Sequence, residues 1–128
     1  MSWALALAVG LGAGVGSALR FGVERAHAAA RTRHGLQAAS FPWATLVVNA
    51  LGSAALGVLS GAPLDERSLA ILGAGLCGGL TTFSTLALDL VLLVRERRLA
   101  RASLYLGAQV LAGVALFSLG LAVGKGLG

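Results

Sequence analysis

Four long runs of apolar residues, separated by short charged segments, constrain this chain more than any other feature. They cover about residues 3–23, 43–59, 68–94 and 103–123. Each run is long enough to cross a bilayer core of about 30 Å as a helix. Only 12% of the 128 residues are charged, about half the share found in a soluble domain. The sequence therefore predicts an all-α integral membrane protein, with four transmembrane helices in a single domain.

The third run contains a stretch, residues 75–86, that does not suit a helix surrounded by lipid. It reads GLCGGLTTFSTL, in which two adjacent glycines precede four hydroxyl side chains within five residues. One interpretation is a helix broken near residues 78–82, whose freed polar groups face an internal cavity. The other is a packing interface of small residues, with the hydroxyls bonded to carbonyls one turn earlier. If straight, the 27 residues of this run would reach about 40 Å, which exceeds the bilayer core and favours the break.

Polar side chains inside the spans are candidates for a site, because they are costly in lipid unless the protein satisfies them. Arg20 either extends its side chain to the membrane surface or lines a vestibule that gathers anions. Asn49 either joins two helices or donates into a pore. Asp89 either pairs with arginines of the following loop or belongs to a site. Tyr105 and Gln109 lie four residues apart and therefore on one face of the fourth span.

Basic residues are distributed unevenly between the two sides of the membrane. Seven of the ten lie in the first and third loops, residues 24–40 and 95–101, whereas the opposite side carries Arg67 and Lys125. Basic loops are retained in the cytoplasm, so this bias predicts a single orientation with both termini outside. The same loops account for the net charge of +5, and we expect no nucleic-acid partner.

Two other classes of protein are disfavoured. The chain has no nucleophile–base pair and no histidine, cysteine or acidic cluster at metal-binding spacing, so we do not expect an enzyme. Small multidrug transporters also have four spans, and assemble as antiparallel dimers, but they need a carboxylate embedded in the membrane, usually in the first span. The first span here has no acid before Glu24, and this alternative is remote.

Three segments resemble the Fluc (CrcB) family of small four-span fluoride channels. Residues 14–21, GVGSALRF, are similar to the family's glycine-rich first helix, which ends in arginine and an aromatic residue. Residues 45–52, TLVVNALG, are similar to its asparagine motif in the second helix. Residues 75–85 reproduce its helix-break signature almost entirely, and this is the most specific of the three. Together with the length and the number of spans, the resemblance covers essentially the whole chain.

The resemblance implies an antiparallel dimer in a bacterial plasma membrane, with two narrow pores for passive fluoride export. It also implies a structural Na⁺ that is not transported, bound by the backbone carbonyls of Gly78 and Thr81. Asn49 would donate a hydrogen bond to fluoride, Phe83 would contribute a ring edge, and Arg20 would lie near the aqueous vestibule. The other pore residues implied by motif position are Thr82, Ser84, Thr85, Leu86, Tyr105 and Gln109.

The chain departs from the family pattern in its pore and in its charge. Leu86 replaces the second phenylalanine of the signature, and Gln109 and Gly113 replace the usual hydroxyls beyond Tyr105. Homodimeric members of the family have a balanced charge distribution, which this chain lacks. These departures favour a subunit of the heterodimeric branch, paired with an oppositely oriented paralogue. In such a heterodimer, this chain is either a conducting subunit or an assembly partner whose own pore is partly degenerate.

Overall fold

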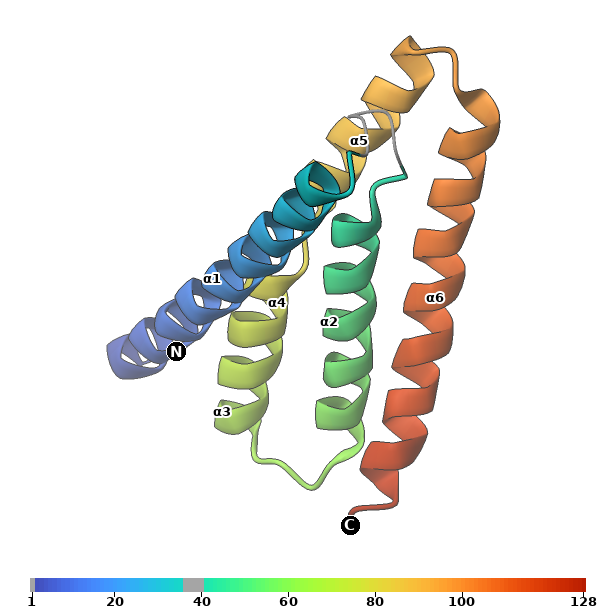
Figure 1. Cartoon of the computed structure of the whole chain (residues 1–128). Coiled ribbons are helices and arrows are strands. Elements are labelled where there is room, and N and C mark those ends of the chain that lie inside the picture. Colours follow the sequence, from blue (N-terminus) through green and yellow to red (C-terminus); the bar gives the residue numbers. More distant parts are fainter. Residues whose placement is uncertain (1, 36–40) are drawn as a thin grey trace.

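The computed structural model describes residues 2–35 and 41–128, and in these ranges every regular element is a helix. Four helices are long and apolar enough to cross a membrane, with the segment Glu66–Arg95 counted as one. This confirms the predicted all-α membrane fold. The elements are α1 (Trp3–Arg33), α2 (Trp43–Gly61), α3 (Glu66–Leu69), the π-helix η1 (Ala70–Cys77), α4 (Gly78–Leu80), α5 (Phe83–Arg95) and α6 (Leu99–Lys125). The C-terminus and the α2–α3 turn lie at one end of the molecule, and the α5–α6 turn lies at the other (Figure 1).

Helix α1 is longer than the sequence led us to expect. It continues to Arg33, through residues that were assigned to a loop beginning at position 24. Residues 24–33 are polar but rich in alanine and arginine, which are strong helix formers. Arg31 and Arg33 lie in the last turn, where cations favour the negative end of the helix dipole. The drop in hydropathy therefore marks a change in polarity along the helix, and the helix itself ends ten residues later.

Close approach of helix backbones holds the four spans together. A Cβ atom added at Gly57 of α2 would collide with the carbonyl oxygen of Phe117 on α6. On the other side of the bundle, a Cβ atom at Gly16 of α1 would collide with the carbonyl oxygen of Leu76 in η1. Small residues at such positions let transmembrane helices pack by van der Waals contact and not by exclusion of water. Gly57 and Gly16 therefore lie where helix backbones meet closely.

The third span is broken, as predicted. It begins at α3, where the carboxylate of Asp65 accepts a hydrogen bond from the backbone N–H of Ser68. It then widens into the π-helix η1 and returns to α-helical geometry in α4. Thr81 and Thr82 are extended, with φ/ψ of −77°/161° and −150°/123°. Helix α5 starts after them and is inclined to α4 (Figure 1). The break thus lies at the carboxyl side of the glycine pair, in the middle of the bundle.

Candidate functional site

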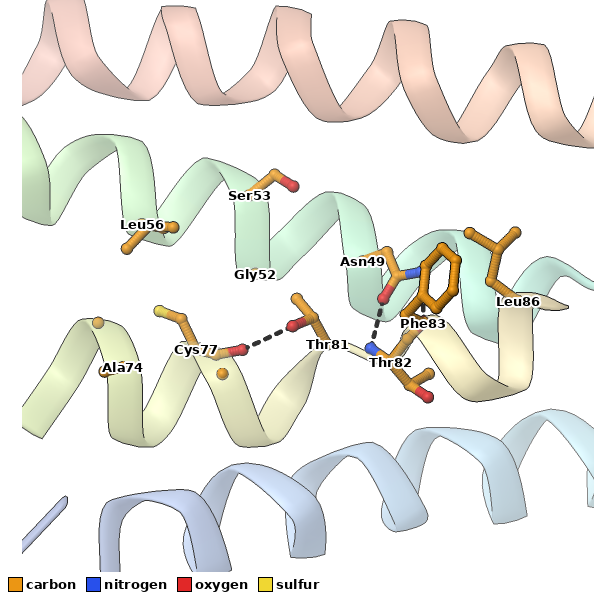
Figure 2. A pocket seen from close by; sticks show the side chains of 12 residues that line it. Asn49, Gly52, Ser53, Leu56, Ala74, Cys77, Thr81, Thr82, Phe83 and Leu86 are labelled. Atoms are coloured by element: carbon orange, nitrogen blue, oxygen red, sulfur yellow. Dashed lines mark hydrogen bonds between the residues drawn. The ribbon is translucent and has the colours of Figure 1, made fainter. Parts of the chain in front are cut away.

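Asn49 of α2 satisfies the backbone at the break of the third span. Its Oδ1 atom accepts a hydrogen bond from the Thr82 N–H at 2.8 Å, and its Nδ2 atom donates to the Thr82 carbonyl at 3.2 Å. Figure 2 shows the first of these contacts. In a continuous helix, the Thr82 N–H would bond to the carbonyl of Gly78. Lipid offers no replacement partner, so one side-chain amide completes the broken backbone.

The hydroxyl side chains of the break also bond to nearby backbone. Both the N–H and the Oγ1 of Thr81 donate to the carbonyl of Cys77, at 3.0 and 3.1 Å. The hydroxyl of Thr82 accepts from the Thr85 N–H at 3.2 Å and so caps α5. The same hydroxyl lies 3.1 Å from the Thr85 hydroxyl and 3.3 Å from that of Ser84. The bond from Thr81 to a carbonyl one turn earlier, which belonged to the packing interpretation, therefore coexists with the break.

Arg20 points toward the break. Its guanidinium donates to the backbone carbonyl of Thr81 at 3.0 Å. One turn earlier on α1, Ser17 donates to the carbonyl of Gly79 at 3.4 Å. The Arg20 side chain is therefore directed to the interior of the bundle and not to the membrane surface. There it stabilises a carbonyl that the break removes from regular helical bonding.

A second polar network lies on the α6 side of Asn49. The Asn49 Nδ2 atom also donates to Gln109 Oε1 at 3.2 Å. One turn away on α6, the fully buried Tyr105 donates its hydroxyl to the Asp89 carboxylate at 2.9 Å. Thr45 of α2 donates to the same carboxylate oxygen at 2.8 Å. Asp89 is thus tied to two hydroxyls within the bundle.

Next to the break lies a pocket of about 500 Å³, formed by α2, η1, α4 and α5. Six of the predicted site residues line it, and five of them are labelled in Figure 2. These six are Asn49, Gly78, Thr81, Thr82, Phe83 and Leu86. Phe83 is 81% exposed, so most of its apolar surface is left for lipid or another protein to cover.

The other predicted site residues lie outside this pocket. Tyr105 and Gln109 are buried in the network on the α6 side, with 0% and 8% of their surface exposed. Arg20 reaches the break from α1, and Ser84 and Thr85 lie in the first turn of α5. Asn49 joins the two groups, because it contacts both Thr82 and Gln109.

Sequence reasoning missed Thr45 and Ser17. Thr45 lies one turn before Asn49, and Ser17 lies just before Arg20 on α1. Thr45 could have been found from its spacing, since residues four apart share a helix face and Asn49 was already a candidate. A lone serine in a glycine-rich helix carries no such signal.

A four-span helical protein, with one span interrupted at membrane depth and its freed backbone satisfied by polar side chains, belongs structurally among channels and transporters. The comparison with known families is more specific. The sequence model described as "CrcB-like protein, Camphor Resistance (CrcB)" matches residues 7–121, and the chain belongs to this family.

Several curated relatives share most of their length with this chain. A "Fluoride-specific ion channel FluC 1" of Thermobifida fusca (strain YX) is 41% identical over 117 residues, which cover 91% of this chain and 92% of the relative. A "Fluoride-specific ion channel FluC" of Methylobacterium sp. (strain 4-46) is 42% identical over 122 residues, 91% of this chain and 93% of the relative. A "Fluoride-specific ion channel FluC 2" of Rhodococcus jostii (strain RHA1) is 52% identical over 81 residues, 63% of this chain and 71% of the relative. All three names describe ion channels, which supports the expectation that this chain is not an enzyme.

Proposed function

We propose that this chain is a subunit of a fluoride-selective channel, which lets fluoride leave a bacterial cytoplasm passively. The observation that carries the proposal is the broken third span held by Asn49, found in a chain whose relatives are named fluoride-specific channels. Fluoride is small and strongly hydrated. A selective path must therefore replace its water with hydrogen-bond donors at membrane depth. The amide and hydroxyl groups around the break are donors of this kind.

The pocket beside the break is the proposed entrance to this path. The edge of an aromatic ring is the positive part of its quadrupole and is able to face an anion. Phe83 is the aromatic residue that lines the pocket, and Thr82, Ser84 and Thr85 place their hydroxyls on either side of it along the chain. Arg20 adds a positive charge next to the break and supports an anion path by its long-range field.

A second subunit in the opposite orientation is proposed to cover the exposed face of the break. Phe83 is 81% exposed beside a pocket of about 500 Å³, and covering this face with protein would enclose the polar groups of the break. The uneven distribution of basic residues between the two sides favours one orientation for this chain, with both termini outside. The partner would then be a paralogue with the opposite bias, and not a second copy of this chain.

The backbone near the break has groups that suit the structural Na⁺ implied by the resemblance. The Thr82 N–H donates to Asn49, so the Gly78 carbonyl lacks the partner it would have in a continuous helix. The Thr81 carbonyl accepts from Arg20 and keeps a second lone pair. Carbonyls of unwound helices are typical Na⁺ ligands in membrane proteins. Bound there, the ion would satisfy these oxygens and add positive potential near the anion path.

Fluoride efflux from liposomes tests the proposal. The chain is reconstituted alone and together with a family member of opposite charge bias, and release is followed with a fluoride electrode. We expect rapid fluoride efflux from the complete channel and none of chloride, measured in parallel. Absence of fluoride efflux from both preparations would refute the channel function. A stable, conducting homodimer from this chain alone would refute the need for a paralogue.

A further inference from the structure

The turn that joins α5 to α6 stands beyond the level at which α2 begins (Figure 1). Helices α2 and α6 run side by side, with Gly57 of α2 against Phe117 of α6. At the other end of this contact, the ring of Phe41, just before α2, meets the ring of Tyr105 edge-on, with 5.4 Å between their centroids. The part of α6 from Leu99 to Tyr105 therefore extends about 9 Å past the start of α2.

This overhang corresponds to the headgroup layer of a bilayer. Phe41 and Trp43 lie where α2 begins, and aromatic residues at the end of a span mark the membrane interface. The polar layer on each side of the hydrocarbon core is about 5–8 Å thick. A turn that extends about 9 Å past the interface therefore lies among the lipid headgroups.

The side chains of the turn combine exposed apolar groups with exposed cations. Val94, Leu99 and Leu104 are 50%, 60% and 64% exposed, and the side chains of Arg95 and Arg97 are exposed beside them. Apolar groups next to arginines suit a bilayer interface, where the apolar groups contact acyl chains and the guanidinium groups reach the phosphates. The turn is therefore built for contact with lipid and not with water alone.

The positive charge of Arg95 and Arg97 is not neutralised within the turn. Residues 95–101 contain four arginines and one glutamate. That acid, Glu96, pairs with Arg98, with 3.2 Å between its Oε2 and the arginine Nε. Among the described residues, neither Arg95 nor Arg97 has an ion-pair partner. These two guanidinium groups are therefore available to an anion outside the chain.

Arg97 also has a backbone conformation that favours glycine. Its φ is 56°, and within residues 2–35 and 41–128 it is the single residue other than glycine with a positive φ. Its N–H donates to the carbonyl of Val94, and the N–H of Arg98 donates to that of Leu93. This pair of bonds ends a helix with a left-handed residue, and that residue is usually glycine. In a chain with 19 glycines, an arginine at this position indicates a role for its side chain.

Membrane orientation does not explain this arginine. Basic residues direct orientation by their number near the ends of the spans, so a cation at any neighbouring position would serve equally well. Arg95, Arg98 and Arg101 already supply such charges in the same turn. A specific contact of Arg97 accounts for both its charge and its position.

We propose that the α5–α6 turn is a binding site for the headgroup of an anionic phospholipid, and that Arg95 and Arg97 bind its phosphate. A guanidinium group is able to bind two oxygens of one phosphate at once, and the acyl chains would lie along Val94, Leu99 and Leu104. The predicted orientation places this turn in the cytoplasmic leaflet, where anionic lipids attract basic segments near the membrane. The proposal does not depend on fluoride conduction.

Native mass spectrometry of the full chain in neutral detergent tests this site. The chain is titrated with phosphatidylglycerol and, separately, with phosphatidylcholine that has the same acyl chains. Arg97→Asn removes the charge and keeps a residue that tolerates a positive φ. Arg67→Asn removes the same charge from an exposed position at the opposite end of the molecule and is the matched control. Inorganic phosphate serves as a competitor without acyl chains.

We expect wild type to bind phosphatidylglycerol more tightly than phosphatidylcholine. Arg97→Asn should weaken the binding of phosphatidylglycerol by about fivefold, whereas Arg67→Asn should leave it unchanged. Equal affinity of wild type for the two lipids, or an equal loss from the two substitutions, would overturn the proposal. Displacement of phosphatidylglycerol by inorganic phosphate at the same concentration would show that the site takes free phosphate, and would overturn the assignment to lipid.

Arg97→Gly supplies a second measurement and is suited to the backbone of the turn. Glycine adopts a positive φ without strain, so this variant should unfold at a higher temperature than wild type in neutral detergent. It should also bind phosphatidylglycerol as weakly as Arg97→Asn does. A lower unfolding temperature would contradict the strain at Arg97, and wild-type affinity for phosphatidylglycerol would refute the role of its guanidinium group.

Discussion

Asn49 and Thr82 exchange two hydrogen bonds between a side chain of α2 and the backbone of the third span, at 2.8 and 3.2 Å. This pair holds the break open at the point where α4 ends and α5 begins. It also fixes the orientation of the Asn49 amide and, through it, that of Gln109. The bonding of the Thr82 backbone and the orientation of Gln109 therefore depend on one amide side chain.

Replacing Asn49 by aspartate tests this dependence. The carboxylate of Asn49→Asp has no N–H for the Thr82 carbonyl or for Gln109, so acceptors would face one another. We expect the protein to lose about 1–3 kcal/mol of stability and fluoride efflux to fall by about tenfold or more. Unfolding in denaturant and liposome efflux measure the two effects. Ser60→Ala on the same helix, which removes a bond within α2, is the control, and unchanged efflux from Asn49→Asp would disprove the central role.

Arg20 should stabilise the break from the opposite side. Arg20→Met removes a charged donor from the Thr81 carbonyl, and hydrogen bonds to charged groups contribute about 1.5–3 kcal/mol. We expect a loss of stability of this size, together with slower fluoride efflux. The matched control is Arg25→Met, because Arg25 lies on the same helix over the ring of Phe21 and away from the break. Equal effects of the two substitutions would show that only net charge matters.

The two glycines Gly14 and Gly16 should respond to alanine in opposite ways, although they lie two residues apart on α1. A Cβ atom at Gly16 would collide with the backbone of Leu76 and approach that of Leu80, whereas one at Gly14 meets nothing within 4 Å. Gly16→Ala should therefore cost about 1–3 kcal/mol by overpacking. Gly14→Ala should be neutral or stabilise the helix by up to about 1 kcal/mol. Unfolding of both variants measures the difference, and similar effects would contradict the packing of α1 on η1.

Much of the fold could be predicted because the membrane imposes strong rules on sequence. Four apolar runs predicted four spans, and the glycine pair followed by hydroxyls predicted the break. The end of α1 could not be predicted, because hydropathy follows the lipid boundary and the helix continues to Arg33. The π-helix η1 was also missed, since nothing in its sequence AILGAGLC separates it from an α-helix.

The site was predicted as a set of residues, but their bonding was not. The structure shows that the amide of Asn49 bonds to Thr82 and Gln109, and these partners were not predicted. That outcome depends on how closely α2 and α6 approach the break, and local sequence carries no information on this distance. In the same way, Asp89 could be placed at membrane depth from the sequence, but its bonds to Thr45 and Tyr105 required the packed helices.

Substitution of Leu86 should distinguish a conducting subunit from an assembly partner. It lines the pocket together with Phe83, and Figure 2 shows both side chains there. It also packs against the buried cluster that contains Tyr105. Leu86→Phe would add an aromatic edge to a pocket of about 500 Å³, which has room for the larger ring. If the lack of an aromatic ring at this position limits conduction through this chain, Leu86→Phe should raise fluoride efflux from the assembled channel. Leu88→Phe, at a position that is 57% exposed on the same helix, should have no effect.

The comparison of these two variants decides between the two roles of the subunit. A chain that conducts only after Leu86→Phe would be an assembly partner with a degenerate pore. A wild-type chain that conducts, and whose efflux Leu86→Phe leaves unchanged, would show that Phe83 supplies the required ring edge alone. The measurement needs the complete channel with the partner's own pore blocked by substitution of its equivalent asparagine, because efflux through the partner would otherwise hide the effect.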